Sequence, residues 1–394
     1  CVTLLVSTVT GGNMFQAWNV GEITEEYFGI PSVAAGIVLA LLVGMVIIGG
    51  IKRIGAVAGR LVPIMVALYL LAGAYVLIVS AGQIPSTFAL IFRSAFSPQE
   101  FSGAFIGGTA GYAFLFGMKR ALFSNEAGQG SSPIAHSAAK TDEPVREALV
   151  AGLEPFIDTL IVCTFTALVI LSTGIWNRAP EATYAALPAV LPVGATEWSL
   201  ETLSAPERIG DEWADGDGVF IVLSAGANAQ SGNNLHRLGG AVAEQNGALV
   251  IEWQTLTSNA RPQVDSPGIY ASYVGATLTA KAFDSVTPGL GKWLVTLAVW
   301  LFAISTMISW CYYGEKGVSY LFGNAGVLPY KIAFLILAIL GATSIDDTTQ
   351  MLLLADLGTG TMLVVNIPIV LILGGLAVAS LREYDRKLKA GEFP

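Results

Sequence analysis

Residues 117–139 read GMKRALFSNEAGQGSSPIAHSAA, and the interpretation of the fold depends on this stretch. It places charged residues, glycines and a proline directly after an apolar run at 102–120. The chain around it is 54% hydrophobic and 12% charged, with a mean hydropathy of +0.64. Soluble domains carry about 25% charged residues. The composition therefore predicts an integral membrane protein in which 117–139 follows a membrane span.

An all-α membrane region is predicted from the apolar runs. A helix needs about 20 mostly apolar residues to cross a bilayer. The segments that meet or approach this length are 1–20, 33–50, 61–82, 102–120, 148–174, 292–312, 330–345 and 361–381. They predict eight spans.

The orientation follows from the basic residues, because Lys and Arg gather in short cytoplasmic connections. They cluster here at 51–60, 138–147, 315–331 and 382–389, whereas the short connections on the opposite side contain only Arg93. We therefore predict a multi-pass protein of the cell (inner) membrane, with a cytoplasmic tail at 383–394.

Residues 177–284 differ from the rest of the chain. They carry twelve acidic and five basic side chains, which is −7 of the net charge of −9. Runs rich in Val, Ile and aromatic residues at 218–225 and 247–256 lie between Gly and Asn clusters and predict strands. We predict an extracytoplasmic, mostly β insertion at 177–269, followed by an external helix within 270–284. A shielding lid is the preferred interpretation of the insertion, and ligand binding is the alternative.

The chain opens at Cys1 inside an apolar run, without Met or a signal-peptide n-region, so we expect a fragment of a longer protein. Cys1, Cys163 and Cys311 all lie in predicted spans. No disulfide framework is indicated.

Two motifs carry a family resemblance. SNEAGQGS (124–131) and NMFQA (13–17) resemble the sodium:alanine symporter family, the alanine or glycine:cation symporters. The resemblance implies secondary active transport, with alanine or glycine carried into the cell together with sodium. It also implies a LeuT-like core of two inverted five-helix repeats. Residues 1–176 would match core helices three to seven, and residues 270–382 would match helices eight to ten. The first two core helices would then be missing, so this chain alone is not expected to transport.

The first span contains a polar helical face. Asn13 and Gln16 are three residues apart, so they share one side of a helix, which is costly to expose to lipid. The alternative is a hydrogen bond between helices, worth about 0.6 kcal/mol. By the resemblance, Phe15 and Gln16 line the amino-acid site, and we add Asn13 to it.

The span at 102–120 is interrupted by glycines in GGTAGYAF (107–114). Glycine-interrupted spans are typical of discontinuous helices that bind a substrate through free backbone groups. Close helix packing is the alternative. We predict that Gly111 and Phe114 contact the substrate.

Sodium requires oxygen ligands, and the span at 292–312 offers three on one turn. These are the Ser305 and Thr306 hydroxyls and the Phe302 carbonyl. Such hydroxyls often hydrogen-bond to their own helix instead. The span resembles the eighth core helix of the family, so we predict a sodium site here, with a proton as the alternative coupling ion.

Charged and amide residues follow the glycine-rich span. Arg120, Asn125 and Glu126 are placed for a cytoplasmic gate network, with a solvated interfacial cluster as the alternative. Asp158 lies inside the span at 148–174, where an ionisable group is a functional candidate by default. Hydrogen-bonded packing is the preferred interpretation of Asp158, because three threonines lie nearby.

The sequence lacks the residue patterns of an intramembrane protease, so we do not expect an enzyme. No cofactor, no metal other than sodium and no nucleic acid partner is expected; the partners are the amino acid, sodium and the lipid bilayer. A membrane receptor or channel-like protein displaying an extracytoplasmic β module remains as the alternative function.

Overall fold

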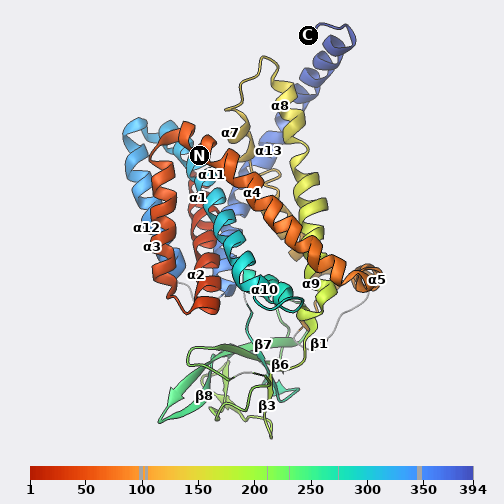
Figure 1. The fold of residues 1–394 in the computed structure, drawn as a ribbon, viewed down its shortest axis with the longest axis vertical. Helices are drawn as coiled ribbons and strands as arrows, with labels where there is room; N and C mark the ends of the chain where they lie inside the picture. Colours follow the sequence, from red (N-terminus) through yellow and green to blue (C-terminus); the bar gives the residue numbers. More distant parts are fainter. Residues whose placement is uncertain are drawn as a thin grey trace. The chain divides into compact units, whose positions relative to one another are not determined.

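The computed structural model describes the whole chain except residues 97–100, 103–104, 211, 230, 274, 344–347 and 394. The chain forms two units (Figure 1). The first unit consists of Cys1–Val79, Met118–Val169 and Gly275–Pro394, and the second of Ser80–Gly117 and Ile170–Val274. Helix α6 (Ala110–Ser124) passes from the second unit into the first along the chain.

The first unit is helical. The elements that lie wholly within it are α1 (Val2–Val9), the π-helical turn η1 (Thr10–Met14), α2 (Phe15–Phe28), α3 (Ser32–Ile47), α4 (Gly50–Val79), α7 (Ser132–His136), α8 (Pro144–Ala151), the π-helical η3 (Phe156–Cys163), α10 (Ala276–Asp284), η5 (Gly291–Val295), α11 (Thr296–Phe322), η6 (Asn324–Gly326), α12 (Val327–Thr343) and α13 (Thr348–Lys389). Helix α9 (Thr164–Thr173) begins in the first unit.

Five stretches of helix among the described residues are long and apolar enough to cross a bilayer. They are Gly50–Val79, Pro144–Thr173, Gly291–Phe322, Asn324–Thr343 and Gln350–Lys389. Helix α3 is apolar but has only 16 residues. The predicted spans at 1–20 and 102–120 are not in this set, so the sequence prediction of eight spans exceeds what the described helices support. Residues 344–345 of the predicted span at 330–345 lie outside the described residues.

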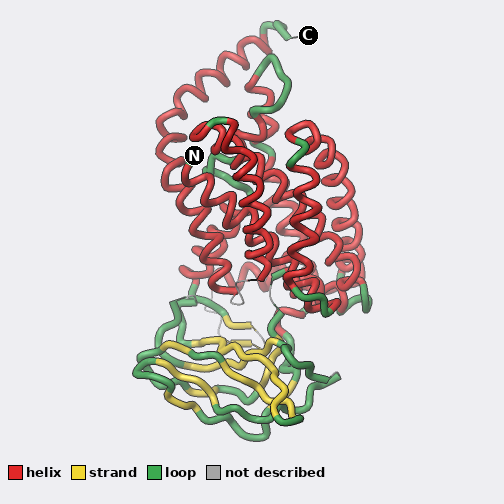
Figure 2. The backbone as a smooth tube through the Cα atoms, turned by 90° about the vertical axis from the view of Figure 1, so that its left-hand side faces the viewer, coloured by secondary structure: helices red, strands yellow, loops and turns green. Residues whose placement is uncertain are grey.

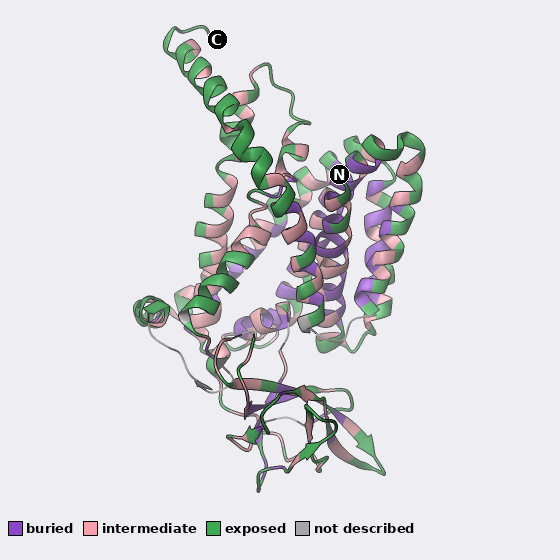
Figure 3. Ribbon diagram, turned by 180° about the vertical axis from the view of Figure 1, so that it is seen from behind, coloured by how far each residue is buried: buried purple, intermediate pink, exposed green. Residues whose placement is uncertain are grey.

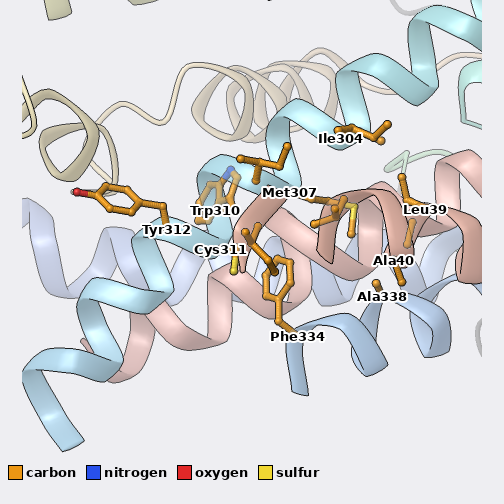
Figure 4. Close-up of a cluster of buried hydrophobic side chains, with 14 of the residues drawn as sticks. Leu39, Ala40, Ile304, Met307, Trp310, Cys311, Tyr312, Phe334 and Ala338 are labelled. Carbon is orange, nitrogen blue, oxygen red and sulfur yellow. The ribbon is translucent and has the colours of Figure 1, made fainter. Parts of the chain in front are cut away.

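The core of the first unit lies between α2, α3, α11 and α12 (Figures 3 and 4). Leu39 and Val43 of α3, Met307 of α11 and Phe334 of α12 are fully buried there. Glycine lets the helices approach: a Cβ at Gly341 of α12 would lie 2.6 Å from the Met14 Cα. Burial of a large apolar side chain stabilises the fold by about 1.5–3 kcal/mol, so this cluster fixes the arrangement of the four helices.

The second unit holds the strands (Figure 2). Its main sheet has the order β3-β11-β6-β7-β8, with β10 also paired to β6, and a smaller sheet has the order β4-β5-β9. The bounds are β3 (Ala182–Thr183), β4 (Val190–Pro192), β5 (Glu197–Leu200), β6 (Gly218–Ser224), β7 (Leu235–Gln245), β8 (Ala248–Trp253), β9 (Leu256–Thr257), β10 (Gln263–Val264) and β11 (Gly268–Ala271). Helix α5 (Ile84–Phe96), the short η2 (Ala81–Gln83) and η4 (Ile175–Asn177) also belong to the unit.

Strand β6 is buried on both faces. Ile221 and Leu223 pack with Leu200 and Leu238, whereas Phe220 stacks on Tyr270 with their ring centroids 5.1 Å apart. Side chains alternate between the two faces of a strand, so the continuous apolar run GVFIVLS indicates a central strand. The strands predicted at 218–225 and 247–256 correspond to β6 and β8.

The predicted helix at 102–120 is wrong in its first half. Strands β1 (Phe101–Ser102) and β2 (Phe105–Ile106) pair with each other, residues 107–109 are irregular, and α6 begins at Ala110. Residues 103–104 of the predicted span lie outside the described residues. Glycine inside a helix costs about 0.5–1 kcal/mol relative to alanine. Gly107 and Gly108 therefore favour a helix start after them rather than a helix through them.

Candidate functional site

The π-helical turn η1 buries a polar side chain in the first unit. Asn13 is 0% exposed, and its Nδ2 donates to the Phe334 carbonyl of α12 at 2.7 Å. Its Oδ1 has no hydrogen-bond partner among the described residues. An unpaired buried polar atom costs about 1–3 kcal/mol, and π-helical turns occur frequently at functional sites. The Asn13 amide oxygen is thus available to accept a hydrogen bond or to ligate a cation.

The two residues after η1 are positioned by local contacts. Gln16 Nε2 donates to the Gly11 carbonyl at 3.1 Å, which closes the side chain over η1. Phe15 meets Phe123 of α6 edge to face, with ring centroids 5.5 Å apart, and stacks on Trp18. The beginning of α2 therefore contacts the end of α6.

Gly111 and Phe114 belong to the second unit, and both are exposed. A Cβ at Gly111 would meet no described atom within 4 Å outside its own helix, and Phe114 is 68% exposed. The structure leaves this face of α6 open and brings no described residue against Gly111.

The end of α6 forms an ion pair with α13. Arg120 donates to Asp356, and Lys119 Nζ lies 3.7 Å from the same carboxylate. The guanidinium of Arg120 also lies over the Phe123 ring, 5.7 Å from its centroid. The sequence indicated Arg120 but not its partner, because the two residues are 236 positions apart.

The loop between α6 and α7 holds the other two predicted gate residues. Asn125 Oδ1 accepts from the Ala127 backbone N–H at 2.9 Å, and Asn125 Nδ2 donates to Thr159 Oγ1 at 3.3 Å. The first bond lies within the loop, and the second attaches the loop to η3.

Glu126 adopts a positive φ of 53° in this loop. Its carboxylate accepts from Ser131 Oγ at 2.5 Å. Burial raises the pKa of Glu126 to about 7; the Ser131 hydrogen bond opposes this rise and the nearby charge of Glu154 adds to it. Glu126 is thus a carboxyl group that changes protonation near neutral pH. Ser131 and Glu154 complete its surroundings, and the sequence did not indicate their roles.

Asp158 joins η3 to the end of α6. Its Oδ2 accepts from Ser124 Oγ at 2.5 Å and lies 3.9 Å from Cys163 Sγ. Thr159 Oγ1 lies 3.4 Å from the same oxygen. Asp158 thus contacts side chains of both α6 and η3, and its packing role stays a prediction.

The predicted sodium ligands lie on one turn of α11. Ser305 is buried, and its Oγ donates to the Phe302 carbonyl at 2.8 Å. Thr306 is half-buried. The Ser305 hydroxyl therefore bonds to its own helix here, and a bound cation would have to replace that bond. A cavity of about 220 Å³, lined in part by Phe302, Tyr69 and Thr166, lies beside this turn.

Comparison with known proteins shows that this chain has relatives among membrane transporters. The model of the sodium:alanine symporter family matches residues 1–203 and 255–394. The sodium/alanine symporter AgcS of Methanococcus maripaludis is 33% identical over 95% of this chain and 61% of its own length. The sodium/proton-dependent alanine carrier protein of Bacillus sp. PS3 is 26% identical over 96% of this chain and 67% of its own length. The amino-acid carrier protein AlsT of Bacillus subtilis is 25% identical over 100% of this chain and 64% of its own length. The chain thus spans about three fifths to two thirds of the length of these relatives.

Proposed function

Because this chain belongs to the sodium:alanine symporter family, we propose that the protein carries a small neutral amino acid, alanine or glycine, into the cell together with sodium. The family is one of multi-pass membrane transporters, and the five long apolar helices agree with it. The match over both helical portions of the chain favours a carrier over a receptor or channel displaying a β module.

Within this chain, Asn13 is the residue that best supports the proposed amino-acid site. Its amide is fully buried in a π-helical turn, and its oxygen is unpaired among the described residues, which supports a role in binding. Its oxygen suits the ammonium group of an amino acid. Phe15 and Gln16 follow directly at the start of α2, so we assign all three residues to the substrate site. From the sequence motif alone we also propose that Gly111 and Phe114 of α6 contact the substrate.

The coupling site is proposed on α11. Sodium is a hard cation and prefers oxygen ligands. The Phe302 carbonyl and the Ser305 and Thr306 hydroxyls would supply three such ligands once Ser305 turns away from its own helix. Since one relative is named a sodium/proton-dependent carrier, a proton is the second candidate ion.

The core is proposed to be LeuT-like, with two inverted repeats to which 1–176 and 270–382 contribute. We place the tail at 383–394 in the cytoplasm and residues 177–284 outside it, in agreement with the positive-inside rule. Arg120, Asn125 and Glu126 would then form a cytoplasmic gate around the end of α6. Their bonds to Asp356 and Thr159 tie that end to α13 and η3, and the bond to Ser131 closes the loop that follows α6.

Uptake into proteoliposomes tests the proposal. The complete protein, reconstituted with an inward sodium gradient, should accumulate labelled alanine or glycine in a saturable manner, and dissipating the gradient should abolish accumulation. A proton gradient at equal sodium separates the two candidate ions. Saturable binding without accumulation under either a sodium or a proton gradient would instead indicate a receptor.

A further inference from the structure

The loop between β6 and β7 contacts the glycine-rich segment that precedes α6, and both belong to the second unit. The Thr109 backbone N–H donates to the Ser231 carbonyl at 2.8 Å. Asn233 Nδ2 donates to the Gly107 carbonyl. Two hydrogen bonds thus connect the predicted insertion to GGTAG (107–111).

Glycine on both sides makes this contact close. A Cβ at Gly108 would lie 3.1 Å from the Ser231 carbonyl oxygen. Gly232 has a φ of +74°, and a Cβ there would lie 2.7 Å from Thr109 Oγ1 and overlap the Tyr112 ring. A side chain at Gly232 would therefore push the loop away from the start of α6.

The loop is built to present Asn233. Ser231 Oγ donates to Asn233 Oδ1 at 2.6 Å, and the Leu235 N–H donates to the same oxygen at 3.0 Å. Asn228 adds a backbone bond to the Asn233 carbonyl at 2.7 Å. With its Oδ1 held by the loop, the amide directs its Nδ2 donor to the Gly107 carbonyl.

The contact lies at the first turn of α6. The first backbone N–H groups of a helix lack partners within the helix, and Thr109, whose carbonyl accepts from Ala113 at 2.9 Å, precedes that turn. Ser231 supplies a partner for the Thr109 N–H. Gly111, assigned above to the substrate site, is two residues further along.

The contact joins a part of the chain that the family model matches to a part that it does not. Residues 107–112 lie within the matched segment 1–203, whereas Ser231, Gly232 and Asn233 lie in 204–254, between the two matched segments. We propose that the β6–β7 loop is a positioning element of the carrier: it docks on residues 107–109, sets the start of α6, and so controls how tightly the amino acid binds. The insertion is then part of the transport mechanism rather than a shielding lid. This inference rests on the proposed function.

Uptake kinetics test the positioning role. Asn233→Ala removes the donor to Gly107, and Gly232→Val separates the two surfaces. Both variants should raise the KM for the amino acid several-fold, while the sodium concentration for half-maximal uptake and the amount of inserted protein stay unchanged. Asn246→Gly is the matched control, because it removes an exposed amide from the β7–β8 turn, where a φ of 53° suits glycine. It should leave the KM as in the parent.

Cross-linking tests the docking without any transport. The Cβ of Gly108→Cys would lie 3.6 Å from the Ser231 Cα, so cysteines at the two positions would be direct neighbours. Gly108→Cys with Ser231→Cys should form a disulfide under mild oxidation, so that fragments cut between the two positions stay joined until reduction. Gly108→Cys with Asn246→Cys should not.

The outcomes separate the two proposals. Absence of the 108–231 disulfide overturns the docking, whatever the uptake. A disulfide with an unchanged KM in both Asn233→Ala and Gly232→Val overturns the positioning role. If the parent protein shows no sodium-dependent uptake, the proposed function fails, and the disulfide still reports whether the loop docks.

Discussion

Arg120 of α6 and Asp356 of α13 form an ion pair that links these two helices. The side chains are 27% and 23% exposed, so both charges are largely withdrawn from solvent. Removing one partner from such a pair leaves the other charge poorly solvated.

Asp356→Asn should destabilise the protein by about 1–3 kcal/mol, because Arg120 loses its charged acceptor. A lowered thermal unfolding midpoint in detergent measures this effect. Lys119→Ala is the control: Lys119 is 47% exposed and 3.7 Å from the same carboxylate, so its loss should cost less than about 1 kcal/mol. Equal effects of the two variants would contradict the importance of the Arg120 pair.

Ser305→Ala combined with Thr306→Ala should raise the sodium concentration for half-maximal uptake at least several-fold, because two proposed ligands are removed. Ser309→Ala provides the comparison, since its hydroxyl bonds to the Ser305 carbonyl one turn further along α11. An unchanged sodium dependence in the double variant would remove the sodium site from this turn.

Gln16→Leu should weaken amino-acid binding about tenfold or more without a matching loss of expression, because leucine keeps most of the volume and loses the amide. Asn19→Leu, one turn along α2, removes an amide that donates to the Phe15 carbonyl and is not assigned to the site. Equilibrium binding of labelled alanine and glycine measures the affinity of both variants. A similar loss of affinity in Gln16→Leu and Asn19→Leu would indicate that Gln16 has a packing role.

Glu126 should make stability depend on pH. A raised carboxyl pKa favours the protonated form in the folded state, so its stabilising contribution is fully present below about pH 4.5 and is lost as the pH rises through about 7. Thermal midpoints measured from pH 4 to 9 should therefore fall across this window in the parent. Glu126→Gln should flatten the fall, whereas Glu207→Gln, at an exposed position of the second unit, should keep it.

The predicted orientation can be tested by labelling in intact cells. A thiol reagent that cannot cross the membrane should label Asn246→Cys above the background of the parent and should not label Gly55→Cys. Both positions are exposed in the structure. Because Gly55 lies in α4, a thiol reagent that crosses the membrane is the control and should label Gly55→Cys. Labelling of Gly55→Cys alone would reverse the proposed topology.

The sequence predicted those helices and strands whose own residues determine how they are buried. Three such elements are α3, α11 and β6. Each could be predicted because its buried positions are occupied by a run of apolar residues. The start of α6 was not visible. It depends on hydrogen bonds to residues as far as 126 positions away. The periodic pattern of apolar residues along a helix does not predict contacts at such a distance.

In the candidate site, too, single residues could be predicted from the sequence, but their distant partners could not. Asn13 could be identified because a polar residue in an apolar span needs a reason to be there. Its bond to Phe334 could not be predicted, because the two residues are 321 positions apart. The arrangement of Ser131 and Glu154 around Glu126 depends on the turn at positive φ, and the sequence indicated only that a turn was present.

The glycines that bring η1 against its neighbours limit how this part of the protein can move. A Cβ at Gly12 would overlap the Trp310 side chain of α11, just as a Cβ at Gly341 of α12 would approach the Met14 Cα. Neither position has free space for a side chain, so a shift of η1 against α11 or α12 would require these contacts to open.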